Sequence, residues 1–77
     1  MSLTAAQCRA ARALLKWSQD KLAEASKVGT STVGNFEREI RIPHDHILAD
    51  MHSALESAGI EFTNGEQPGV RLRKGKP

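Results

Sequence analysis

The sequence is poor in the residues on which several classes of protein depend. Among its 77 residues there is one cysteine, aromatic residues make up 4%, and tyrosine is absent. No apolar run approaches the roughly 20 residues that a membrane-spanning helix needs. The N-terminal residues contain no apolar segment followed by a small-residue cleavage site, so we expect no secretory signal. These absences predict one soluble, cytoplasmic domain that binds no membrane.

The single cysteine and the placement of the charges further limit the kinds of site and partner that the chain can have. A lone Cys8 excludes an internal disulfide and a cysteine-based zinc cluster within one chain. Its spacing to Ala11 and Leu15 predicts a buried core thiol. The net charge is only +2, but the basic residues are unevenly placed, which favours an anionic partner. They gather at Arg38 and Arg41 and again at Arg71, Arg73, Lys74 and Lys76.

Four segments repeat apolar residues at helical spacing. Thr4, followed three residues later by Gln7, fits a capping box and predicts a first helix over residues 5–16. Ser18 is a favourable N-cap for a short second helix, and a third begins near Thr30. The fourth follows Pro43 and ends at residue 59. The expected inward positions are Cys8, Ala11, Leu15, Leu22, Ala23, Ser26, Val33, Phe36, Ile40, Ile47, Leu48, Met51, Leu55 and Ala58.

After Gly59 the apolar period changes from 3.6 to 2, which is typical of strands. Glu61 and Arg71 alternate with apolar neighbours, and the turn sequence TNGEQPG separates the two runs, so we predict a β-hairpin. The fold class is therefore mainly α, with four helices and a C-terminal hairpin. We divide the chain into a domain over residues 1–58, a hairpin over 59–73 that is a candidate dimerisation element, and a basic tail over 74–77. One face of the hairpin carries Ile60, Phe62, Val70 and Leu72.

The stretch SKVGTSTVGNFE, Ser26–Glu37, is built from residues that form helices poorly, yet it lies between helical runs. Two short helices joined by about three residues, over residues 18–38, form a helix-turn-helix motif, whose second helix enters the DNA major groove. Short hydroxyl and amide side chains let such a helix approach bases and phosphates closely. Val33 and Phe36 hold its inner face to the core, and Gly29 begins it with free backbone N–H groups for phosphate.

These residues resemble the lambda-repressor/Cro-like, or XRE-type, family of helix-turn-helix regulators. The resemblance covers about residues 8–58 and is carried by WSQDKLAEA, Val28, STV at 31–33, Glu37 and Pro43. It implies a four-helix domain that binds double-stranded DNA as a transcriptional regulator. We expect a repressor-like homodimer on a palindromic site, because one short helix reads few bases.

The resemblance also implies roles for particular residues. Gln19 corresponds to a residue that binds phosphate and buttresses the recognition helix, and Arg12 and Glu37 match a charged pair that locks the first helix to the end of that helix. The chain departs from the family where Lys27 and Glu39 replace common glycines, and where Gly34 offers no side chain for base reading. The expected DNA-contacting residues are Gln19, Thr30, Ser31, Thr32, Gly34, Asn35, Arg38 and Arg41, with Asn35 as the main base reader.

Two other hypotheses belong to different classes. Such a domain can be the antitoxin of a toxin–antitoxin pair, in which it binds both DNA and a toxin protein. Alternatively, His44, His46, Asp50 and His52 suggest a metal-dependent role, although spacing places only His46 and Asp50 on one helix face. No residues have the positions of a catalytic arrangement. We therefore expect no enzyme activity, no catalytic residues, no metal site and no cofactor.

Overall fold

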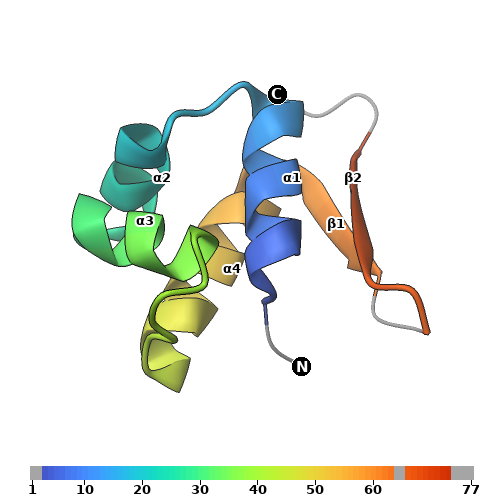
Figure 1. The fold of residues 1–77 in the computed structure, drawn as a ribbon. Helices are drawn as coiled ribbons and strands as arrows, with labels where there is room; N and C mark the ends of the chain where they lie inside the picture. The colour runs from blue at the N-terminus through green and yellow to red at the C-terminus, as the bar shows by residue number, and fades with distance from the viewer. Residues whose placement is uncertain (1–2, 64–65, 74–77) are drawn as a thin grey trace.

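Four helices and a two-stranded antiparallel sheet make up the described part of the chain (Figure 1). The computed structural model describes residues 3–63 and 66–73. The predicted fold class is confirmed, and the predicted basic tail, residues 74–77, lies outside the described residues. The elements are α1 (Ala5–Leu15), α2 (Gln19–Ser26), α3 (Thr30–Glu37), α4 (Asp45–Ser57), β1 (Ile60–Thr63) and β2 (Gly69–Leu72).

Side-chain caps set the starts of the first two helices. The Thr4 hydroxyl accepts a hydrogen bond from the Gln7 backbone N–H at 3.0 Å, and the Gln7 side chain accepts one from the Thr4 N–H at 3.1 Å. This is the predicted capping box, which satisfies two N–H groups at the start of α1. The Ser18 hydroxyl caps α2 with a single bond, by accepting from the Lys21 N–H at 3.0 Å.

The ends of α1, α2 and α3 share one geometry. Left-handed residues directly follow α1 and α2, at Lys16 and Lys27 with φ of 59° and 61°, and the left-handed Glu39, with φ of 61°, follows α3 after Arg38. Backbone hydrogen bonds then close each end, as in the Schellman motif: at α3, for example, the Ile40 N–H donates to the Asn35 carbonyl at 2.9 Å. A left-handed conformation at a residue other than glycine costs about 1–2 kcal/mol. Packing of the helices against the core therefore has to offset a cost at each of the three ends.

The end of α3 differs from the sequence-based expectation. Ile40 was expected to continue the apolar spacing of this helix, but α3 ends at Glu37 and the Ile40 side chain is 65% exposed. The left-handed residue Glu39 reverses the chain direction, so the residue after it no longer follows helical spacing. The first helix likewise ends one residue earlier than predicted, because Lys16 is left-handed.

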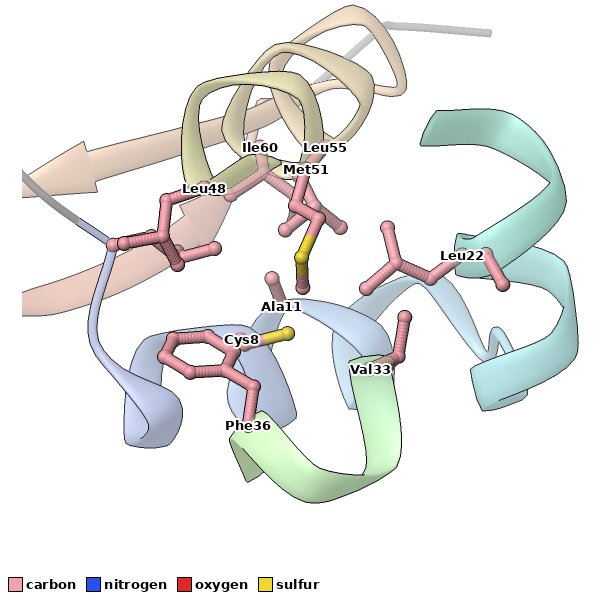
Figure 2. Close-up of a cluster of buried hydrophobic side chains, with 11 residues drawn as sticks. Cys8, Ala11, Leu22, Val33, Phe36, Leu48, Met51, Leu55 and Ile60 are labelled. Atoms are coloured by element: carbon pink, nitrogen blue, oxygen red, sulfur yellow. The ribbon is translucent and has the colours of Figure 1, made fainter. Parts of the chain in front are cut away.

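All four helices and the first strand contribute to one core (Figure 2). α1 and α3 face α4 across it, and α2 closes one side with Leu22. The largest fully buried side chains include Leu22, Met51, Leu55 and Ile60. Burying a side chain of this size stabilises the fold by about 1.5–3 kcal/mol. The side chains labelled in Figure 2 are Cys8, Ala11, Leu22, Val33, Phe36, Leu48, Met51, Leu55 and Ile60.

The hairpin packs on two helices, with β2 against α1 and β1 against α4. Its predicted register is confirmed, because Glu61 pairs with Arg71 and Ile60 with Leu72. Ile60 is fully buried, but Leu72, on the same predicted apolar face, is 44% exposed. The Gln7 side chain connects α1 to the hairpin by donating to the carbonyl oxygens of Thr63 and Gly69, at 3.3 and 3.2 Å. The hairpin is therefore part of the domain core rather than an appendage.

Candidate DNA interface

α2, the three-residue turn 27–29 and α3 form a helix-turn-helix unit, in which the two helices pack against each other. Gly29 is the N-cap of α3 and has an extended backbone, with φ −73° and ψ 147°. Since glycine has no side chain to cap the helix, the first N–H groups of α3 are left for other acceptors. They carry the positive end of the helix dipole, which favours an anion such as phosphate.

The outer side of α3 is polar. Thr30 and Ser31 are exposed, Thr32 and Asn35 are half-buried, and the inner side of the helix is buried in the core. Arg38, just after the helix, and Arg41, in the loop that leads to α4, are both exposed. A surface hollow extends from the polar outer stripe of α3 to the loop that leads to α4. It is lined by Ser31, Thr32, Asn35, Arg41, Ile42, Pro43, His44 and Ile47.

Gly34, which was expected at an outward position, is buried. A Cβ atom placed on it would lie 3.3 Å from Gln19 Oε1 and 3.5 Å from Arg38 Nη1. The absent side chain thus leaves a flat surface, on which the side chains of Gln19 and Arg38 lie. Gln19 and Arg38, which were both expected to contact DNA, therefore both lie over Gly34 in the middle of α3.

Glu37, the last residue of α3, is the centre of a buried hydrogen-bond network. Its carboxylate accepts two bonds from the Arg12 guanidinium, at 2.7 and 2.8 Å, and one from Gln19 Nε2 at 3.0 Å. The Cys8 thiol donates a fourth, at 3.0 Å. The glutamate side chain is 2% exposed, and the arginine is 20% exposed. The expected ion pair is present, and it fixes α1 and α2 to the C-terminal end of α3.

The network shifts the pKa values of its ionisable side chains. Burial alone would raise the pKa of Glu37, but the hydrogen bonds from Arg12, Cys8 and Gln19 outweigh it and hold the pKa below its usual range. The hydrogen bond to Glu37 raises the pKa of Arg12. Burial, reinforced by the neighbouring carboxylate, raises the pKa of the Cys8 thiol. At neutral pH the site therefore holds a carboxylate, a guanidinium and a neutral thiol.

Two members of this arrangement were not identified from the sequence. Arg9 donates to the Glu37 backbone carbonyl and lies 3.9 Å from the Glu39 carboxylate, so a second arginine of α1 holds the end of α3. Cys8 was predicted to be buried, which is confirmed, but its hydrogen bond to Glu37 was not foreseen. Cys8 belongs to a repeat of apolar residues, and nothing in that repeat indicates that its thiol faces a carboxylate.

The histidines lie in two separate parts of the structure. The rings of His44 and His46 stack at 6.0 Å before and within the first turn of α4. His52 instead stacks on Phe62 of the hairpin at 4.3 Å, and its Nδ1 lies 3.3 Å from the Glu56 carboxylate. Within residues 3–63 and 66–73, no three His, Cys, Asp or Glu side chains come together as metal ligands. None of the helices described is long and apolar enough to cross a membrane.

Comparison with known proteins identifies the domain. A helix-turn-helix family model matches residues 9–60, which is more than half of the chain and includes the Arg12–Glu37 pair, the turn and α3. A search of curated proteins finds no match. The chain therefore belongs to the lambda-repressor/Cro-like, XRE-type family of helix-turn-helix proteins, which are DNA-binding regulators.

Proposed function

We propose that the chain is a sequence-selective, repressor-like transcriptional regulator that binds a palindromic DNA site as a homodimer and reads the major groove with α3. The observation that carries this proposal is the division of α3 into two sides. Val33 and Phe36 are buried, whereas Ser31 and Asn35 belong to a polar outer stripe. A helix fixed on one side and polar on the other suits the major groove, which is about 12 Å wide.

Phosphate contacts would surround this helix. The Gln19 amide donates one N–H to Glu37, and its second N–H remains for a phosphate oxygen. The N-terminal turn of α3, with the hydroxyls of Thr30 and Thr32, offers further donors. Arg38 and Arg41 add two exposed positive charges near the same surface. Such contacts position the protein on DNA but carry no sequence information.

The test is selection of binding sites from random duplex DNA, followed by affinity measurements over a range of salt concentrations. Log affinity should fall linearly with log salt, with a slope of about −0.9 per neutralised phosphate. Asn35→Ala should change the preference among selected sites and leave nonspecific binding largely intact. An interaction that is absent, or insensitive to salt, would overturn the proposal. Equal losses on all sequences in Asn35→Ala would assign Asn35 to the backbone instead.

The outer edge of β2 is the proposed dimer contact. The described sheet has two strands, so β2 pairs on one side only, and it lies at the edge of the molecule in Figure 1. The Arg73 N–H donates to the Gly59 carbonyl at 2.7 Å, and bonded pairs alternate along antiparallel strands. The N–H and C=O groups of Val70 and Leu72 therefore point away from β1. Unpaired edge groups of this kind can pair with a two-fold related copy.

The dimer contact can be tested without removing the hairpin. Leu72→Pro deletes an outward N–H and should shift the mass measured by sedimentation towards the monomer, because proline cannot donate at a sheet edge. Leu72→Ala, which keeps the N–H and removes most of the 44% exposed side chain, is the matched control. A Leu72→Pro variant that is still dimeric would rule out this edge. Truncation after Ala58 is a weaker test, because it also removes the fully buried Ile60 from the core.

A different surface favours the second candidate function, the antitoxin of a toxin–antitoxin pair. Ile40 and Ile42, in the loop between α3 and α4, are 65% and 81% exposed. Neighbouring exposed apolar side chains are typical of protein contacts. Ile42 also lines the hollow that contains Ser31 and Asn35, so a toxin bound there should change DNA affinity. Coexpression with the product of a neighbouring reading frame tests this, with Ile42→Ser expected to weaken a complex and to leave DNA binding by the free chain in place.

A further inference from the structure

The side chains of Asn35 and Arg38 are joined before any DNA is bound. Arg38 Nη2 donates a hydrogen bond to Asn35 Oδ1 at 3.0 Å. Ser31, Asn35 and Arg38 are separated by four and three residues, so they share one outward stripe of α3 and its C-terminal end. The pair therefore lies on the side of the helix that faces the groove in the proposed complex.

Gly34 supports the position of the Arg38 guanidinium. A Cβ atom at Gly34 would lie 3.5 and 3.8 Å from the two terminal nitrogens of Arg38, so the guanidinium lies against the backbone of α3. Gln19 Oε1 faces the same place, at 3.3 Å from that Cβ position. The guanidinium is thus held beside Asn35 by a hydrogen bond on one side and by the glycine surface below it. This limits the directions in which Arg38 can point.

The hydrogen bond changes what Asn35 can read. Asparagine recognises adenine with both ends of its amide: the oxygen accepts from N6, and the nitrogen donates to N7. Here the oxygen already accepts from Arg38, so a positively charged donor group lies beside it and would repel the donor amino group of an adenine. The oxygen keeps one lone pair, whereas several N–H donors remain, on the Asn35 amide nitrogen and on the other guanidinium nitrogens, so that donors predominate at this place. The matching base edge carries acceptors, and guanine offers two of them, O6 and N7.

We infer that Asn35 and Arg38 act as one reading unit that selects guanine over adenine at the base pair facing Asn35. The inference rests on the proposed major-groove reading by α3 and makes it more specific. It also gives Arg38 a role beyond phosphate contact, because the arginine sets which half of the Asn35 amide is available. The two side chains are then coupled, and changing one alters the preference of the other.

The experiment is selection from random duplex DNA with three full-length chains: the wild type, Arg38→Ala and Arg41→Ala. For the wild type we expect guanine to be preferred over adenine by about tenfold at one position of each half-site. Arg38→Ala frees the Asn35 oxygen, so the preference at that position should shift from guanine to adenine. Both arginines are exposed, so neither change should alter folding, which a thermal melt checks.

Arg41→Ala is the matched control. The hydrogen bond between Arg41 and Asn35 joins the Arg41 backbone N–H to the Asn35 carbonyl oxygen at 3.4 Å, and the substitution leaves both of these groups in place. It removes the same charge and should weaken binding on all sequences while the base preference stays unchanged. Adenine selected by the wild type, or an Arg38→Ala variant that loses affinity with no change of preference, would overturn the inference and leave the proposed function standing. No selected site for the wild type would overturn the proposed function, and the inference with it.

Discussion

Two arginine–glutamate pairs of the same chemistry lie in opposite surroundings in this molecule. Arg12 and Glu37 meet at 2.7 Å between α1 and α3, with side chains that are 20% and 2% exposed. Arg71 and Glu61 meet at 2.5 Å across the hairpin, with side chains that are 73% and 36% exposed. Water and salt screen the hairpin pair far more strongly. Burial and additional hydrogen bonds, rather than the distance between the charges, therefore decide what each ion pair contributes.

The buried pair also has a different structural role from the exposed pair. Removing two charges from water is costly, and their attraction repays that cost only when further hydrogen bonds satisfy both groups. Gln19 and Cys8 supply those bonds to Glu37, and the Trp17 carbonyl accepts another from Arg12 at 2.9 Å. Every one of these partners comes from α1, the start of α2 or the segment between them. The network therefore fixes the angle at which α3 is presented more than it adds net stability.

The largest expected effect is that of removing Arg12. Arg12→Ala leaves the Glu37 carboxylate buried beside two weaker partners, Gln19 and Cys8, and should lower the free energy of unfolding by roughly 3 kcal/mol. Urea denaturation followed by circular dichroism measures this directly. A denaturation midpoint that does not move would show that the pair contributes no more than an exposed one.

A double variant separates the effect of losing the two charges from the effect of losing side-chain volume. Arg12→Met combined with Glu37→Gln removes both charges and keeps similar volumes, so it should recover part of the lost stability. A double variant no more stable than Arg12→Ala would show that the unpaired charge is not the main cause of the loss.

Acid should act on the same site. The pKa of Glu37 is held below its usual range in the folded state, and the unfolded value is about 4.3. This carboxylate therefore contributes stability that is fully present above about pH 4.3 and is lost as the pH falls through the folded pKa. We expect the wild type to lose stability in this acid range and Glu37→Gln to lose less, in denaturant titrations at successive pH values. Glu61→Gln, which removes the carboxylate of the exposed hairpin pair, is the matched control.

The sequence predicted the partners in both pairs, for different reasons. Glu61 opposite Arg71 follows from strand alternation, because a period of 2 fixes the register once one face is apolar. Arg12 and Glu37 lie 25 residues apart, so no local period links them. Only the resemblance to a known family indicated that they meet. Local patterns thus predicted the elements and the hairpin, whereas long-range polar contacts needed knowledge of the fold.

The features that were missed have physical reasons. Gln7 was recognised as a capping residue, but its amide also donates to the hairpin, because α1 ends up beside β2. Gly34 was expected to face outward, and it is covered by two long side chains that spacing cannot position. Ile40 fitted a helical period that the left-handed Glu39 interrupts. At Gln7 a tertiary contact added a second role to the predicted one, whereas at Gly34 and Ile40 tertiary contacts or a left-handed backbone overruled a period read from the sequence.

A smaller effect is expected at Cys8, on the edge of the buried network. Cys8→Ala removes the thiol that donates to Glu37 and should cost about 1.5 kcal/mol, since the bond is made to a charged group. Cys8→Ser keeps a donor in nearly the same place and should cost less. Thermal melts of the two variants compare them. A larger loss for serine than for alanine would mean that burial of a polar hydroxyl outweighs the hydrogen bond.

The smallest effect is expected at the exposed pair, and it completes the comparison. Arg71→Ala should lower the free energy of unfolding by about 0.5 kcal/mol, and high salt should erase most of that difference. The measurement is urea denaturation at low protein concentration, with Arg12→Ala beside it as the buried counterpart.

Protein concentration then becomes the informative variable. Arg71 belongs to β2, whose outer edge is the proposed dimer contact, so the surroundings of this pair in the dimer differ from those in the monomer. If the dimer covers it, water is excluded, and the cost of Arg71→Ala should rise with protein concentration, because association adds to apparent stability by mass action. A cost that stays near 0.5 kcal/mol at every concentration would leave the pair exposed in the dimer. Burial by a second copy would thereby convert the hairpin pair into the kind of contact that Arg12 and Glu37 already make within one chain.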